Sequence, residues 1–252
     1  MAFTWAEKRR FYIIGGAVLM GLTLLLGVVF AVIYKVPSCA DGKQNQDESG
    51  IDCGGSCQYL CSAAVEVPRV TFARAITTNG RTDVIAYVEN RNRTAEAKDA
   101  SYTVEVFDEE GTLLGTRKGM LDLPARTTVP VFVPGIAPGT SFAPRAFITF
   151  DGDMKWRNVR DDVPALSVGN ASLVPGDHPR VIATLSNPSS TAVYDQEVVA
   201  TVYGLEGLAI AASRTVVRSI DPSGSKEAVF TWLEPFPSEA TRVEVRAVPE
   251  LP

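Results

Sequence analysis

The chain has 252 residues, of which 46% are hydrophobic and 21% charged, and its one histidine is His178. This length suits one large or two small domains, and the charged fraction is that of an ordinary globular protein. The net charge of −5 argues against a nucleic-acid-binding protein, which needs a basic surface. A single histidine excludes His-cluster metal sites and leaves little room for Ser-His-Asp chemistry.

Residues 11–34 form an uncharged apolar run that predicts one transmembrane α-helix. As a helix the run is roughly 36 Å long, enough to cross a hydrocarbon core of about 30 Å. It is longer than the apolar part of a cleaved signal peptide and lacks a small-residue cleavage site, so we expect an uncleaved signal anchor. The aromatic residues predicted at the membrane interfaces are Trp5, Phe11, Tyr12 and Tyr34.

The positive charges around this run predict its orientation. Three basic residues precede it at positions 8–10, and Lys35 and Lys43 follow it. The positive-inside rule therefore places residues 1–10 as a cytoplasmic tail and residues 35–252 outside the cytoplasm. The lipid bilayer is accordingly a predicted partner, and the predicted location is the cell membrane, crossed once.

Residues 35–64 form a cysteine-rich segment that holds all four cysteines of the chain: Cys39, Cys53, Cys57 and Cys61. The segment has few apolar residues for a core, so crosslinks or a metal must hold it together. Outside the cytoplasm, clustered cysteines predict two disulfides, with three connectivities left open. A zinc or iron–sulfur site is the second interpretation, because zinc ligands usually come as two close pairs and 13 residues separate Cys39 from the next cysteine.

Five oxygen-bearing side chains lie between the first two cysteines: Asp41, Asn45, Asp47, Glu48 and Asp52. Calcium takes six to eight oxygen ligands, so this loop is a candidate calcium site, although its spacing is not that of an EF-hand. A solvated acidic turn closed by disulfides is the first interpretation and calcium the alternative. No other cofactor is predicted.

The segment also carries a recognisable pattern, C-x-D-G-x-x-N-x-D-E-x-G-x-D-C-G-G-x-C-x-x-x-C, which runs from Cys39 to Cys61. This pattern resembles a small cysteine-rich motif that recurs in extracellular and surface-anchored proteins, including uncharacterised single-pass proteins of bacteria. The resemblance implies an exported, membrane-proximal module and no particular reaction.

Beyond residue 64 the sequence consists of short alternating runs separated by turn residues, which is typical of β-sandwich strands. Residues 84–90 (VIAYVEN) align with 181–187 (VIATLSN), and residues 102–107 (YTVEVF) align with 198–203 (VVATVY). The offsets of 97 and 96 residues indicate a tandem duplication.

The repeat predicts an all-β soluble part made of two tandem immunoglobulin-like β-sandwiches, at 65–156 and 165–252, joined by a linker at 157–164. The linker is short and charged, so we expect two beads with limited hinge freedom. Residues 104–111 (VEVFDEEG) resemble FxLYD-type immunoglobulin-like domains of prokaryotic surface proteins. That resemblance implies a spacer or an interaction module.

The sequence contains no nucleophile motif, phosphate-binding loop or paired-histidine motif, so we predict no catalytic or cofactor-binding residues and no small-molecule substrate. Trp156 and Trp232 are candidates either for partner contacts or for the core. The predicted function is a non-enzymatic, membrane-anchored extracytoplasmic protein that acts as a spacer or binds a protein partner through its β-domains. The alternative is an accessory subunit of an envelope assembly, such as a pilus, secretion or transport machine.

Overall fold

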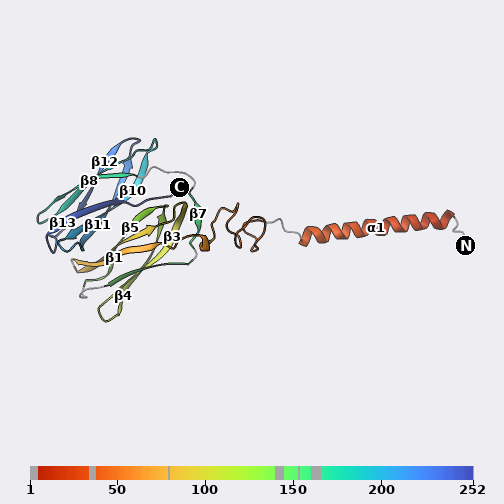
Figure 1. Ribbon diagram of the computed structural model, residues 1–252, viewed down its shortest axis with the longest axis horizontal. Helices are drawn as coiled ribbons and strands as arrows, with labels where there is room; N and C mark the ends of the chain where they lie inside the picture. The colour runs from red at the N-terminus through yellow and green to blue at the C-terminus, as the bar shows by residue number, and fades with distance from the viewer. Residues whose placement is uncertain are drawn as a thin grey trace.

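The computed structural model describes residues 5–33, 38–78, 80–139, 145–152, 154–159 and 166–251. The described elements are α1 (Trp5–Ile33), η1 (Ser62–Ala64), β1 (Arg69–Thr78), β2 (Arg81–Asn90), β3 (Ala95–Phe107), β4 (Leu113–Leu123), β5 (Thr127–Pro138), β6 (Arg145–Phe150), β7 (Trp156–Asn158), β8 (Ser167–Val174), β9 (Arg180–Ser186), β10 (Val193–Gly204), β11 (Ala209–Ile220), β12 (Ser225–Thr231) and β13 (Ala240–Ala247). A mostly β soluble part with one N-terminal helix is therefore confirmed (Figure 1).

Helix α1 is long and apolar enough to cross a bilayer, and none of its apolar stretch is buried against the rest of the protein. It begins at Trp5, six residues before the uncharged run, so the basic residues at positions 8–10 lie in its first turns. Trp5, Phe11 and Tyr12 are exposed on this helix, and their place at a membrane interface stays a prediction. Tyr34 lies outside the described residues.

Strands β1 to β7 form what we call the N-terminal unit. One sheet has the order β1-β2-β5, and the other has the order β4-β3-β6 with β7 also paired to β3. All these pairs are antiparallel. A buried apolar cluster fills the space between the two sheets and includes Val84, Val104 and Val131. Trp156 on β7 belongs to this cluster and is 2% exposed, so it is a core residue.

Strands β8 to β13 form what we call the C-terminal unit, with sheets in the orders β12-β9-β8 and β11-β10-β13. Its own cluster includes Val181, Val202 and Phe230, and Trp232 packs against it. The strand orders of the two units correspond: β2 and β9 are the centres of one pair of sheets, and β3 and β10 are the centres of the other. The aligned segments of the sequence thus occupy the same places in both units.

A buried asparagine closes each unit in the same way. Asn90 donates through its side-chain amide to the carbonyl oxygens of Ala95, Leu123 and Pro124, at 2.9 to 3.0 Å. Its counterpart, 97 residues later, is Asn187, whose amide donates to the carbonyl oxygens of the corresponding segments, at residues 191, 220 and 221. Since buried carbonyl groups need hydrogen-bond donors, one side chain satisfies the ends of several strands in each unit.

We predict that Asn90→Ala and Asn187→Ala each lower the free energy of unfolding by about 2 to 4 kcal/mol, because each leaves several buried carbonyl groups without a donor. Urea unfolding of the full chain in detergent, followed by tryptophan fluorescence, measures this loss. The control is Asn170→Ala on the exposed part of β8, which should change stability by less than about 0.5 kcal/mol. Near-neutral results for both buried positions would contradict the assigned role.

Candidate functional site

The cysteine-rich segment, residues 38–64 in its described part, is closed by two disulfides, Cys39–Cys57 and Cys53–Cys61. The prediction of two disulfides is therefore confirmed, and the structure selects one of the three possible connectivities. Gly50 lies so close to the second disulfide that a Cβ atom there would be 2.9 Å from both sulfur atoms. Only glycine fits at this position without displacing the crosslink.

Two of the predicted calcium ligands hold the loop together through backbone hydrogen bonds. The Asp52 carboxylate accepts hydrogen bonds from the N–H groups of Asp41 and Gly42, at 2.9 Å each. The Glu48 carboxylate is buried and accepts a hydrogen bond from the N–H of Asn45 at 3.1 Å. Both carboxylates therefore have a structural role in the fold of the loop.

The remaining predicted ligands also contact neighbours in the loop. Asp41 accepts a hydrogen bond from the Asn45 side-chain amide at 2.8 Å, and Asp47 accepts one from the Ser56 hydroxyl at 2.8 Å. Partial desolvation acts to raise the pKa of Asp41, but the hydrogen bonds from Asn45 and from two backbone N–H groups lower it overall. The five side chains thus lie in one hydrogen-bonded loop, and calcium binding by this loop stays a prediction.

This segment is docked onto the N-terminal unit. The N–H of Leu60 donates to the carbonyl oxygen of Trp156 at 2.8 Å, and Tyr59 forms a β-bridge with Arg157. The side chains of Leu60 and Val65 pack against the apolar cluster of that unit. The cysteine-rich segment therefore has a fixed position on β7.

A cavity of about 580 Å³ opens at this junction. Its lining comes from the cysteine-rich segment, from β3 and from the residues that lead into β7: Gln58, Tyr59, Lys98, Asp99, Ser101, Asp151, Met154, Lys155 and Arg157. Arg157 pairs with the buried Glu96 at 2.9 Å. The volume falls within the range of about 300 to 1,000 Å³ that is typical of small-ligand sites.

The second candidate site is the contact between the two units. A third apolar cluster joins them and consists of Ile76, Ile85, Tyr87, Val199, Tyr203, Ala209 and Ala212, with Phe72, Phe132 and Val248 packed at its edge. The sheet of β2 in one unit thus faces the sheet of β10 in the other. The linker composition predicts two beads, whereas the structure packs the units face to face, because both strands carry apolar side chains on both sides.

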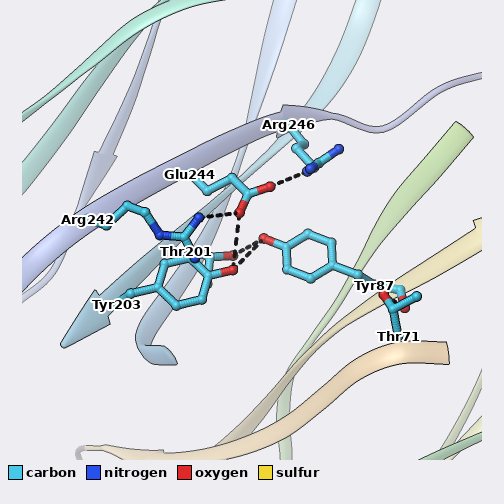
Figure 2. Close-up of polar contacts among 7 residues, drawn as sticks. All are labelled: Thr71, Tyr87, Thr201, Tyr203, Arg242, Glu244 and Arg246. Atoms are coloured by element: carbon cyan, nitrogen blue, oxygen red, sulfur yellow. Dashed lines mark hydrogen bonds and ion pairs between the residues drawn. The ribbon is translucent and has the colours of Figure 1, made fainter. Parts of the chain in front are cut away.

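A polar network is embedded in this contact (Figure 2). The Tyr87 hydroxyl lies 2.8 Å from the Thr201 hydroxyl and 3.4 Å from that of Tyr203. The Tyr203 hydroxyl donates to the Glu244 carboxylate at 3.3 Å. Two arginines flank that carboxylate and cover the tyrosines: Arg242 lies 3.9 Å above the ring of Tyr203, and Arg246 lies 5.4 Å above that of Tyr87. Each buried hydroxyl therefore has a partner across or beside the interface.

The end of the chain reinforces the contact. The N–H of Val248 donates to the carbonyl oxygen of Glu197, and the Gln196 side chain donates to the carbonyl oxygen of Val248 at 2.7 Å. Further on, the N–H of Leu251 donates to the Asp122 carboxylate of β4 at 2.6 Å. The segment after β13 thus joins the C-terminal unit to the N-terminal unit.

Sequence patterns had singled out neither the cavity nor the interface. The interface had a usable signal: residues 84–88 (VIAYV) and 198–203 (VVATVY) lack the apolar–polar alternation of a strand with one wet face. The cavity had none, because its residues lie far apart in the sequence. His178, the lone histidine, contacts the carbonyl oxygen of Leu233 at 2.8 Å on the surface.

No protein-family model matches the sequence, and no curated protein matches it. Among solved structures, the transglutaminase of red sea bream is similar at 16% identity over 72% of this chain and 30% of its own length, with a TM-score of 0.23. A β-glucuronidase of glycoside hydrolase family 2 is similar at 10% identity over 79% of this chain and 25% of its own, with a TM-score of 0.20. This chain spans less than a third of either structure, and these TM-scores are too low to define a shared fold.

Burial raises the pKa of Tyr87, Tyr203 and Tyr102 above the usual value of 10.0. A phenol with a raised pKa in the folded state keeps its proton where the unfolded chain loses it. The stability linked to Tyr87 and Tyr203 is therefore complete below pH 10 and falls as the pH rises above it.

We predict that the unfolding temperature of the chain falls above pH 10 and that Tyr87→Phe makes this fall smaller, because phenylalanine does not ionise. At neutral pH the same variant should cost about 1 kcal/mol, the contribution of one buried hydrogen bond. Differential scanning calorimetry at neutral pH and above pH 10 measures both effects. Tyr194→Phe, at an exposed position, is the matched control. An identical alkaline loss in the wild type and in Tyr87→Phe would refute the linkage.

Proposed function

We propose that this chain is a non-enzymatic, single-pass membrane protein that holds a rigid β-structure outside the cytoplasm, as a spacer or an interaction module. The observation that carries the proposal is the inter-unit contact, in which Ile85, Tyr87, Val199 and Tyr203 are buried between the two units. Units that could move independently would expose this apolar surface to water. A rigid body holds whatever it presents in a constant position.

The two disulfides support the extracytoplasmic placement. Structural disulfides persist in oxidising compartments and are rare in the cytosol. All four cysteines of the chain are paired, and they lie shortly after a helix that is able to cross a bilayer. With basic residues 8–10 at the start of that helix, the positive-inside rule gives the same orientation.

The matching strand orders support a tandem duplication of an immunoglobulin-like sandwich. Asn90 and Asn187 occupy equivalent places and make equivalent hydrogen bonds. Domains of this architecture present loops and sheet faces to partners, which agrees with a spacer or a binding role. The alternative role is that of an accessory subunit of an envelope assembly, and the experiments below distinguish the two roles.

We predict that a cysteine placed at Glu206, in the exposed turn between β10 and β11, reacts in intact cells with a membrane-impermeant maleimide. The matched control is Ala2→Cys in the predicted cytoplasmic tail, which should react only after the cells are lysed. Mass-tag gel shifts of the labelled chain give the readout. The opposite pattern, with Glu206→Cys protected and Ala2→Cys labelled, would reverse the proposed orientation.

We predict that the detergent-extracted chain migrates on native gels as a monomer or dimer if it is a spacer. A large, stable complex would favour the envelope-assembly alternative.

Spin labels at Glu206 and Lys118, one on each unit, should give a single narrow distance distribution by pulsed electron paramagnetic resonance, because the interface fixes the two units. Tyr87→Ala, which truncates a side chain of the inter-unit contact, should broaden this distance distribution. A distribution that is already broad in the wild type and is unchanged by Tyr87→Ala would contradict a rigid arrangement of the two units.

A further inference from the structure

The cavity beside Tyr59 is lined by cations, by hydrogen-bond acceptors and by an aromatic ring. The docking of the cysteine-rich segment on β7 does not itself require this combination. Its lining residues come from separate segments of the chain. The hydrogen bond from the Leu60 N–H to the Trp156 carbonyl oxygen helps to hold these segments together. Its volume of about 580 Å³ is large enough for a small ligand. The side chains that line it decide which class of ligand fits.

Two cations at the cavity are available to a ligand. Lys98 and Lys155 are both exposed, and within the described ranges neither ammonium has a carboxylate at ion-pair distance. Arg157, the third cation of the lining, already pairs with Glu96. An ammonium in a partly enclosed site binds a carboxylate through a charge-assisted hydrogen bond. The two lysines therefore favour a ligand with a negative group.

The same cavity also offers acceptors for hydroxyl groups. Asp99 and Asp151 are exposed carboxylates in the lining, and Ser101 and Gln58 add groups that both donate and accept. A compact dianion such as phosphate would be repelled by these two carboxylates. A polyhydroxylated ligand with one carboxylate would instead donate its hydroxyl protons to them.

The third feature is an aromatic surface. The side chain of Tyr59 is 37% exposed, and its ring lies 5.7 Å from the Lys155 ammonium nitrogen. Aromatic rings pack well against apolar faces, and sugar rings have such a face of C–H groups. An aromatic platform next to a cation and to hydroxyl acceptors thus matches a sugar that carries a carboxylate.

The acceptor side of the cavity is built in advance. Lys98 and Asp99 lie in an irregular stretch of β3, where the pairing with β4 shifts between Ala97 and Ala100. Asp99 has a φ angle of 52°, which is uncommon for a residue other than glycine. Its N–H is fixed by Asp122 at 2.8 Å. Bulges of this kind redirect side chains next to functional sites.

We propose that this cavity binds a saccharide containing a uronic acid, with Lys98 and Lys155 contacting the carboxylate and Tyr59 stacking on the ring. Asp99 and Asp151 accept hydrogen bonds from the hydroxyl groups. Asp122, which also accepts a hydrogen bond from the N–H of Leu251, is a positioning residue for the bulge. The proposal deepens the interaction role proposed above and rests on it for its cellular setting, since acidic polysaccharides occur outside the cytoplasm.

The test is isothermal titration calorimetry of the full chain in detergent with methyl β-glucuronide, a sugar with one carboxylate, and with methyl β-glucoside as the matched neutral probe. We expect binding of the acidic sugar alone, weakened about tenfold by Lys155→Ala, by Lys98→Ala and by Tyr59→Ala, because each removes a charge-assisted or stacking contact. Lys118→Ala and Tyr194→Ala, exposed positions away from the cavity, are matched controls and should leave the affinity unchanged.

Three outcomes would overturn the proposal: no heat of binding at about 10 mM methyl β-glucuronide, roughly ten times a millimolar dissociation constant; equal binding of methyl β-glucoside; or equal losses in the control variants. Thermal unfolding of every variant shows that it is folded, and Lys98→Gln provides a milder variant if Lys98→Ala is unstable. Because the purified protein is used, a negative result here leaves the membrane orientation and the rigid body untouched, and the labelling experiment tests those separately.

Discussion

Strands β2 and β10 are buried on both faces, and the arrangement of the β-rich part depends on the contact between their outer sides. The inner sides of these strands fill the cores of their own units, and the outer sides meet each other through Ile85, Tyr87, Val199 and Tyr203. Burying this apolar area stabilises the assembly of the two units, since the alternative is its exposure to water. The hydroxyl groups of the two tyrosines restrict how the sheets meet, because each needs a partner in a place without water.

The corresponding faces of the two units have different surroundings. The counterpart of Tyr87 in the second unit is Thr184, which is exposed, and the counterpart of Tyr203 in the first unit is Phe107, which packs against Phe147 on an outer face. The units therefore stack with opposite sheets in contact, the β2 sheet of the first against the β10 sheet of the second. One outer face of each unit is therefore buried in the contact between the units, and the other faces solvent.

The cysteine-rich segment is held in place by crosslinks and by docking, without a core of its own. It is too short and too polar to form a core of its own, so two disulfides, a hydrogen-bonded acidic loop and docking on β7 hold it in place. Its docking has a further consequence, since the junction encloses a cavity whose lining neither partner could supply alone. The tail that follows β13 reaches Asp122, which holds the bulge of β3 at that cavity. Asp122 thus contacts both the bulge at the cavity and the segment that follows β13.

The sequence by itself determined the features that depend on neighbouring residues or on a repeat. The apolar run predicted a helix, and the structure extends it to Trp5, because the charged residues before the run are also good helix formers. The cysteine cluster predicted two disulfides, and the strand periodicity predicted a β-rich soluble part. Trp156 and Trp232 looked the same as possible surface or core residues, and only packing places both against apolar clusters.

The tertiary structure decided whatever depends on residues that are distant in the chain. Tyr87 and Thr201 are separated by 114 residues, and no local pattern states that their hydroxyl groups meet. The disulfide connectivity and the cavity lining are likewise properties of the folded chain, since hydrophobic periodicity specifies which side of a strand is buried but leaves open what covers it. The charged linker pointed to separate beads because linker composition reports only local stiffness. The units pack together because the surfaces of the β2 and β10 sheets are complementary, and no single segment of the sequence specifies that complementarity.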